Sequence, residues 1–138
     1  ADLNTLGIVA NEAAYREGAP WLDALLPYID ANHDFAEQYL KTQCPDIRYK
    51  KAQGTYLAWL EMGDLVTGID AKAKAAQAGL ESSEHYMERW LVERAHVQLN
   101  PGSSYGAGGE GHMRMNIATP RAVIKQAIDN LASAIKTA

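Results

Sequence analysis

The chain has 138 residues, of which 47% are apolar and 22% charged, a composition typical of a globular domain and unlike that of collagen or disordered chains. Its formal net charge is -4 and it has no basic run, which argues against nucleic acid as a partner because phosphate backbones require clustered lysine and arginine. Its apolar runs are far shorter than the roughly 20 residues that span a bilayer, so we expect no membrane segment.

Two helices are predicted at the beginning of the chain. The first covers residues 6–17 and ends at Gly18, a residue typical of helix ends. The second covers residues 21–40, where apolar side chains recur with the period of an α-helix. Pro27 lies inside this helix and predicts a kink or a restart near residues 24–26, because proline removes a backbone donor.

The middle of the chain predicts two strands and an irregular segment. Residues 47–51 and 55–62 are rich in Tyr, Ile, Leu and Trp and predict a strand pair, the second strand being apolar on both faces. Residues 63–81 show little hydrophobic periodicity. We interpret them as a mobile surface excursion with one helical turn around residues 71–78.

The last part of the chain predicts a helix, two strands and a final helix. Ser82 or Ser83 caps the first of these helices, a strand follows at residues 96–99, and a glycine-rich loop covers residues 100–111. Thr119 as a cap and Pro120 as the first helical residue begin the final helix, whose apolar stripe is Ile124, Ile128, Leu131 and Ile135.

Residues 112–118, between this loop and the final helix, alternate as a half-buried strand does. One side carries Met113, Met115 and Ile117, and the other carries His112, Arg114, Asn116 and Ala118. Together these elements predict an α+β fold, in which a small, mainly antiparallel sheet is covered by helices.

The candidate sites other than Arg114 are weak. Residues 106–111 match the dinucleotide pattern G-x-G-x-x-G, but a strand and not a helix follows, so a loop with positive φ is the better interpretation. The four histidines have no spacing typical of a metal site, and we expect no metal. The single cysteine, Cys44, is interpreted as structural and fits a reducing compartment, from which we expect a cytoplasmic protein.

Arg114 is the strongest candidate for a binding residue. Its planar guanidinium group can hold a carboxylate with two parallel hydrogen bonds, and a strand beside a glycine-rich loop is a rigid platform for such a contact. The alternative is an arginine on the solvent face of a sheet. The residue pattern alone leaves both interpretations open.

Several segments, in order, resemble the carboxyl-terminal part of the class I and II aminotransferases. The resemblance is strongest to their branch of carbon-sulfur beta-lyases, the cystathionine beta-lyases, which use pyridoxal phosphate. It rests on Gly54-Thr55-Tyr56-Leu57-Ala58-Trp59-Leu60, Leu99-Asn100-Pro101-Gly102-Ser103-Ser104-Tyr105-Gly106, Gly109-Glu110-Gly111-His112-Met113-Arg114-Met115-Asn116-Ile117-Ala118 and Pro120-Arg121. The segment from Ala13 to Leu22 resembles the family's approach to the helix that joins its two domains.

The resemblance implies an enzyme that acts on an amino acid with pyridoxal phosphate, either as an aminotransferase or as a carbon-sulfur beta-lyase. It implies that Arg114 grips the α-carboxylate of the substrate and orients the bond to be broken. Tyr105 and Gly106 resemble the loop that borders the active-site mouth, and we assign them no chemistry. No catalytic residue is expected in this chain.

The family's cofactor lysine and phosphate-binding motifs are missing from the sequence, so we expect a part of a larger enzyme. Residues 1–20 would end the large domain, residues 21–42 would form a connecting helix, and residues 43–138 would form an aminotransferase-like small domain. Such a chain would be inactive by itself, bind no pyridoxal phosphate alone, and need the missing large domain and a second copy in a homodimer. The alternative is a stand-alone, non-catalytic binding module.

Overall fold

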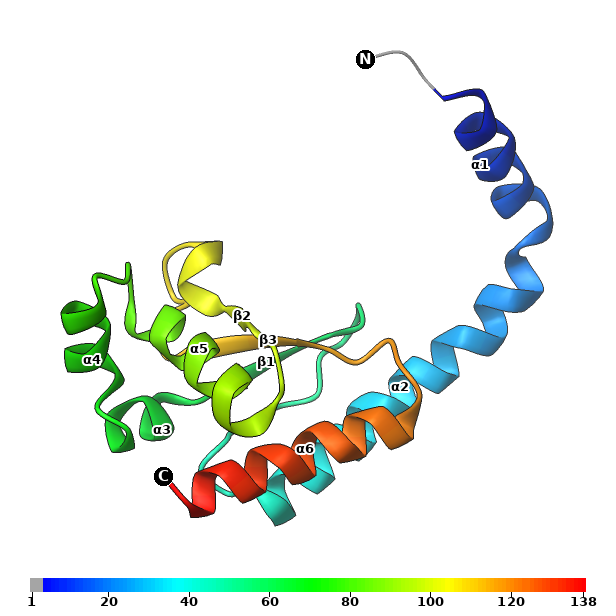
Figure 1. Ribbon diagram of the computed structural model, residues 1–138. Coiled ribbons are helices and arrows are strands. Elements are labelled where there is room, and N and C mark those ends of the chain that lie inside the picture. The colour runs from blue at the N-terminus through cyan, green and yellow to red at the C-terminus, as the bar shows by residue number, and fades with distance from the viewer. Residues whose placement is uncertain (1–3) are drawn as a thin grey trace. The chain divides into compact units, whose positions relative to one another are not determined.

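The computed structural model describes residues 4–138 and places them in two compact units, residues 4–31 and residues 32–138. Figure 1 labels the helices and strands. The first unit is entirely helical. The second holds the sheet, the remaining helices and almost the whole core.

The first unit contains helix α1, Thr5–Glu17, and the beginning of helix α2, Ala19–Gln43. The Asn4 side chain caps α1 by accepting a hydrogen bond of 2.9 Å from the Leu6 N–H. Both predicted helices are therefore confirmed. Pro27 lies inside α2, which continues without a restart, so only the other predicted alternative, a kink, is left. The predicted kink stays a prediction.

The second unit is built around a three-stranded antiparallel sheet with the order β1-β3-β2. The strands are β1, Leu57–Glu61, β2, Asn100–Pro101, and β3, His112–Asn116. Because β3 is central, each of its residues is held from the side by β1, and residues 113 and 114 are held from both sides. The predicted α+β class and antiparallel sheet are confirmed.

Helices cover one face of this sheet. The buried face carries Ala58 and Leu60 from β1 and Met113 and Met115 from β3, each at most 5% exposed. They join a core with helix α5, Ser83–Ala95, helix α6, Arg121–Lys136, and the second half of α2. The core residues of these helices include Leu40, Met87, Leu91, Ile124, Ile128 and Leu131.

The second half of α2 lies beside α6, as Figure 1 shows, and side-chain hydrogen bonds hold it there. The Tyr39 hydroxyl donates to Asp129 at 2.6 Å. The buried Asn32 amide donates to the carbonyl oxygens of Ile117 and Thr119, both at 3.0 Å, and so holds the turn between β3 and α6. This turn ends at Pro120, and α6 begins one residue later than predicted, at Arg121.

The predicted strand at residues 47–51 is wrong apart from one bridge, between Arg48 and Glu61. The residues after Arg48 form hydrogen bonds with side chains of α2 and not with the backbone of β1. The Tyr49 hydroxyl meets the buried His33 ring, and the Lys51 N–H donates to Glu37. Hydrogen bonds to helix side chains thus replace the backbone pairing of a strand. The apolar pattern of residues 47–51 does not reveal this substitution.

Residues 63–81 form two helices: the predicted helical segment at residues 71–78 is confirmed, and a second helix replaces the beginning of the predicted excursion. Helix α3 covers Gly63–Gly68 and helix α4 covers Ala71–Ala78, and each has residues in the core or beneath α5. The buried residues are Leu65, Ile69, Ala71 and Ala75. Alanine gives a weak periodic signal, yet its small side chain lets two helices approach closely. The predicted mobility stays a prediction.

The predicted strand at residues 96–99 is also wrong. His96 ends α5 in the left-handed conformation, with φ 54°, which breaks any strand at its first residue. The extended pairing starts later, at β2, and leads directly into a short 3-10 turn, Gly102–Tyr105. The predicted loop of residues 100–111 therefore contains the short strand β2 and a 3-10 turn.

Candidate functional site

The candidate site lies on the sheet face that the helices leave open. Directly opposite residues of antiparallel strands share a face, and the register places Arg114 between Trp59 of β1 and Asn100 of β2. Residues 55–62 are apolar on both faces, and Trp59, on the open face, remains 36% exposed. The open face thus presents one cation at the centre of the sheet.

Arg114 is held against an aromatic ring. Its guanidinium carbon lies 4.5 Å from the centre of the Tyr105 ring, a cation–π distance. Its Nε atom is buried and has no hydrogen-bond partner among the residues that the structure describes. No ion pair of Arg114 occurs in residues 4–138 either. The side chain is therefore a half-buried cation whose natural partner, a carboxylate or phosphate, is not supplied by this part of the chain.

Two more rings extend the aromatic surface beside Arg114. Trp59 meets Tyr105 edge-on, with 5.9 Å between ring centres, and stacks on His112 at 5.6 Å and 18°. His112 Nδ1 bonds the Glu110 carbonyl oxygen at 2.8 Å, which assigns the proton to Nδ1 because a carbonyl only accepts. Tyr105, Trp59 and His112 form one row of rings, which we call the aromatic row.

Backbone packing fixes the turn that carries Tyr105. Gly102 and Gly109 touch through their backbones, and a Cβ atom on either glycine would overlap a carbonyl oxygen of the other. Gly106 and Gly111 adopt φ of 102° and 72°, values that favour glycine. The glycines predicted to need positive φ therefore close the loop tightly, and this loop leads into β3 rather than into a helix.

The buried carboxylate of Glu84 anchors the end of this loop to α5. Glu84 is 2% exposed, and its Oε1 accepts the Gly111 N–H at 2.8 Å and the Ser83 hydroxyl at 3.0 Å. Burial raises the pKa of Glu84, but these bonds and those from its own N–H and from Ser82 outweigh burial and lower the pKa below its ordinary value. The carboxylate is therefore charged at neutral pH and fixes the start of β3.

The predicted site residues fall in different places. Arg114 and Tyr105 come into direct contact. Gly106 follows Tyr105 and ends the turn, where its N–H donates to the Ser103 carbonyl oxygen at 3.4 Å. Sequence reasoning missed Trp59 and His112 as neighbours of Arg114. The alternation of residues 112–118 already placed His112 on the Arg114 face, whereas Trp59 required the strand register.

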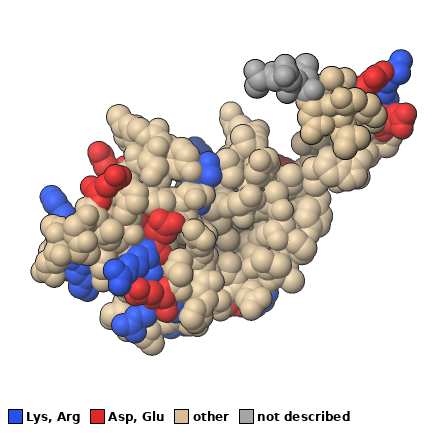
Figure 2. All heavy atoms as spheres, turned by 45° about the horizontal axis from the view of Figure 1, so that its top comes forward, with Lys and Arg blue, Asp and Glu red and all other residues tan. Residues whose placement is uncertain are grey.

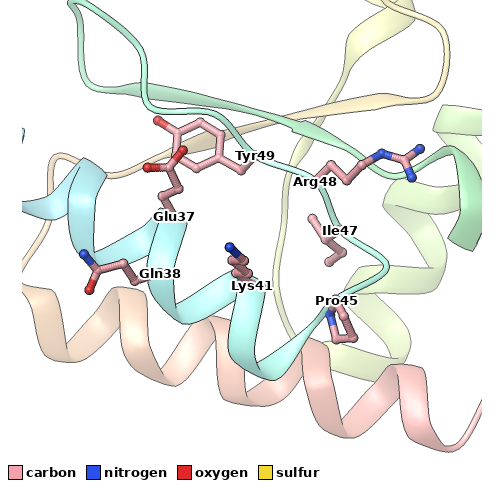
Figure 3. A pocket seen from close by; sticks show the side chains of 7 residues that line it. All are labelled: Glu37, Gln38, Lys41, Pro45, Ile47, Arg48 and Tyr49. Carbon is pink, nitrogen blue, oxygen red and sulfur yellow. The ribbon is translucent and has the colours of Figure 1, made fainter.

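A pocket of about 520 Å³ lies elsewhere, between the end of α2 and the segment that follows it. Figure 3 shows its lining side chains, which are Glu37, Gln38, Lys41, Pro45, Ile47, Arg48 and Tyr49. The most strongly basic group there, Arg48, already pairs with Glu61 at 2.6 Å and Asp64 at 3.0 Å. These acids neutralise Arg48, and Lys41, the other cation of the pocket, is exposed, so we place the candidate site at the half-buried Arg114 and not in this pocket.

Other chemistry is not supported by the described residues. Residues 4–138 contain no cluster of three histidine, cysteine, aspartate or glutamate side chains that could hold a metal ion. Burial raises the pKa of the Cys44 thiol to about 11, so it is a poor nucleophile at neutral pH, which agrees with a structural role. Basic and acidic side chains are interspersed on the face shown in Figure 2. None of the helices in residues 4–138 is both long and apolar enough to cross a membrane.

Comparison with known proteins gives a consistent set of relatives, although no family model matches the chain. The chain is 33% identical to the cystathionine beta-lyase PatB of Bacillus subtilis and 32% identical to the protein MalY of Escherichia coli, over 96% of its own length in each case. It spans about a third of the length of these relatives, 30% in each. These similarities confirm the resemblance predicted from the sequence.

The fold gives the same result. The PLP-bound C-S lyase of Staphylococcus hominis, solved with the inhibitor L-cycloserine, superposes with a TM-score of 0.83 at 30% sequence identity. This match covers 97% of the present chain and 32% of the lyase chain.

Proposed function

Because the chain is homologous to the carbon-sulfur beta-lyases of the aminotransferase fold, we propose that it works as part of a longer, pyridoxal-phosphate-dependent enzyme acting on amino acids. Its own contribution is Arg114, which binds the α-carboxylate of the substrate. The single observation that carries this assignment is the half-buried guanidinium group at the centre of the open sheet face, which has no acidic partner within residues 4–138.

The geometry of Arg114 suits this role. The side chain stands on the central strand, so its backbone is held by both neighbours. The Tyr105 ring covers the guanidinium group and Nε is buried, which leaves the terminal amino groups for a ligand. Two parallel hydrogen bonds from these groups fix both the position and the plane of a carboxylate. A substrate held in this way presents its Cα bonds in one orientation.

The described residues do not form a site for the cofactor itself. Six of the seven lysines are exposed, and the seventh, Lys51, is half-buried and pairs with Asp34 at 2.8 Å. Lys125 pairs with Asp129, and its pKa is raised by the hydrogen bond to that carboxylate, which is the opposite of what a reactive amine needs. We therefore propose that pyridoxal phosphate is bound by a large domain outside this chain, and that this chain alone is inactive and binds none.

The reaction we propose is the beta-elimination of a sulfur-containing amino acid such as cystathionine. The names of the relatives support this choice over transamination. Pyridoxal phosphate supplies an electron sink for such chemistry when it is bound. The residues of this chain orient the substrate and take no further part, so an aminotransferase remains the second candidate reaction.

The domain arrangement that we propose follows the sequence prediction. Residues 1–20 end the large domain, residues 21–42 form the connecting helix, and residues 43–138 form the small domain. The helix surfaces of the first unit support this arrangement, since α1 has no buried residue and Leu6, Val9 and Trp21 are each at least 60% exposed. We propose that the large domain and a second copy of the protein, in a homodimer, cover such surfaces.

The test begins with the reading frame that encodes the chain. We expect an additional coding region for a domain with a cofactor lysine, and a purified full-length protein with the visible absorbance of bound pyridoxal phosphate. It should release a thiol from cystathionine. An Arg114→Lys variant should keep the absorbance and lose most of the activity.

Two results would reject the proposal. A reading frame that encodes only these residues would favour the stand-alone binding module, which is the alternative function. A full-length enzyme whose affinity for amino acids is unchanged by Arg114→Lys would reject the role of Arg114 and leave the family assignment in place.

A further inference from the structure

Tyr105 has no role in the proposed reaction, yet its side chain contacts Arg114, the residue proposed to bind the substrate. Its ring lies 4.5 Å from the Arg114 guanidinium carbon, although the ring itself is 50% exposed. A half-exposed tyrosine contributes little to a core. Its position over a cation with no acidic partner in residues 4–138 calls for another explanation.

The loop of residues 102–111, which includes the turn that carries Tyr105, is anchored at both ends. Gly102, at its start, packs against Gly109 backbone to backbone. The Ser103 hydroxyl bonds the Ser82 hydroxyl at 2.9 Å, at the beginning of α5. The Gly111 N–H, at the far end of the loop, is held by Glu84. Tyr105 is therefore presented from a fixed backbone and does not depend on a freely moving loop.

Trp59 supports the ring from the side. It stands opposite Arg114 in the strand register and meets the Tyr105 ring edge-on, at 72° between ring planes. Trp59 is itself stacked on His112, whose orientation is fixed by the Glu110 carbonyl oxygen. The aromatic row thus restrains Tyr105 on one side, while the sheet restrains Arg114.

We propose that Tyr105 is a positioning residue for Arg114: its ring, supported by Trp59, fixes the plane of the guanidinium group and so sets the affinity for the substrate carboxylate. The proposal rests on the proposed function of Arg114. Fixing the plane removes rotational freedom before the ligand arrives, and the ring excludes water from one face of the cation. The effect belongs to the ring and does not need the Tyr105 hydroxyl.

The test measures the contribution of the carboxylate directly, on the full-length enzyme that carries this chain. L-alanine and ethylamine differ by the carboxylate alone. The ratio of their inhibition constants therefore measures how much the carboxylate strengthens binding, and we call this ratio the carboxylate preference. We expect Arg114→Lys to remove most of this preference. Tyr105→Leu should lower it about 3- to 30-fold, the range of a partly desolvated cation–π contact. Tyr105→Phe should keep it within about twofold of the wild type, since the ring remains.

A matched control and a shape-conserving series complete the experiment. Tyr56 is exposed to a similar extent, 47%, and lies outside the aromatic row, so Tyr56→Leu should leave the preference unchanged. If Tyr105→Leu fails to fold, phenylalanine with increasing ring fluorination at position 105 weakens the cation–π attraction at nearly constant shape. The preference should then fall with each fluorine added.

The outcomes separate the two proposals. If Arg114→Lys does not change the preference for L-alanine, the proposed function of Arg114 is wrong. If Arg114→Lys removes the preference but Tyr105→Leu or the fluorinated series leaves it intact, the role of Tyr105 is wrong and that of Arg114 stands. Equal weakening of L-alanine and ethylamine by Tyr105→Leu also rejects positioning, because the effect would then not pass through the carboxylate.

Discussion

The two faces of β3 differ in what surrounds them. On one face Met113 and Met115 are at most 5% exposed and pack with the core beneath the helices. On the other face Arg114 is half-buried beside Trp59 and Tyr105, and Asn116 is exposed. Five residues of one strand thus serve two environments.

The two faces therefore differ in which property a substitution changes. Removing a core side chain leaves a cavity, so the buried face determines stability. Arg114 makes no ion pair within the described chain, so we predict that its removal costs folding little and, given its proposed role, reduces carboxylate binding strongly. Substitutions on the two faces should therefore separate stability from binding, and the following predictions test that separation.

Met113→Ala should have the largest effect on folding. Met113 is fully buried between the sheet and the helices, and a truncated core methionine costs about 2–5 kcal/mol of the free energy of unfolding. Urea denaturation of the chain measures this loss. Met115→Leu is the volume-conserving control and should cost less than about 1.5 kcal/mol. A small loss for Met113→Ala would mean that the two faces do not differ as described.

Arg114→Lys should show the opposite behaviour. Lysine keeps the charge but cannot form two parallel bonds to a carboxylate, so kcat/KM of the full-length enzyme should fall about 100-fold. The midpoint of urea unfolding should change less than for Met113→Ala, because the loss is confined to the Tyr105 contact, worth about 0.5–2 kcal/mol. A large loss of stability with unchanged kcat/KM would place Arg114 among the structural residues.

Much of this division of faces can be predicted from the sequence. The alternation of residues 112–118 gives both faces of β3 correctly, because period-two patterning is the direct consequence of strand geometry. The structures of residues 47–51 and 96–99 could not be predicted correctly. The first segment is determined by side-chain contacts with α2, and the second by the left-handed residue that ends α5. Apolar composition alone does not report such partners.

The candidate site could be predicted only in part. The chemistry of Arg114 is visible in its residue type and in the strand pattern around it. Its aromatic neighbours come from segments far apart in the sequence, and only the pairing of β1 with β3 brings Trp59 opposite Arg114. Glu84 was not a candidate at all, since a glutamate in the first turn of a helix is ordinarily a solvated residue.

Glu84→Gln should have an intermediate effect on stability. The amide accepts weaker bonds than the buried carboxylate, so we expect a loss of about 1–3 kcal/mol at pH 7. The pKa of Glu84 is lowered in the folded chain, so its contribution is present above the ordinary pKa of about 4.5 and is lost as the pH falls through the folded value. The gap between wild type and variant should close in that acidic range.

A matched variant makes this pH dependence specific. Glu81 lies near the same end of α5 but is 89% exposed, and Glu81→Gln should change neither the stability at pH 7 nor its pH dependence appreciably. Urea unfolding at several pH values measures both variants. A gap for Glu84→Gln that persists unchanged at pH 3 would show that the charge is not what anchors the loop.

Asn116→Ala should have the smallest effect and thereby limits the interpretation of the open face. Asn116 is exposed on the same face as Arg114, two residues further along β3, and its side chain accepts the nearby Ala118 N–H at 2.8 Å. The expected loss is about 0.5 kcal/mol, the range of ordinary surface substitutions. The substrate-carboxylate preference should stay unchanged, because Asn116 lies outside the aromatic row. If Asn116→Ala instead weakened that preference as much as Tyr105→Leu, the open face would act as a whole, and the specific role of the ring over Arg114 would be lost.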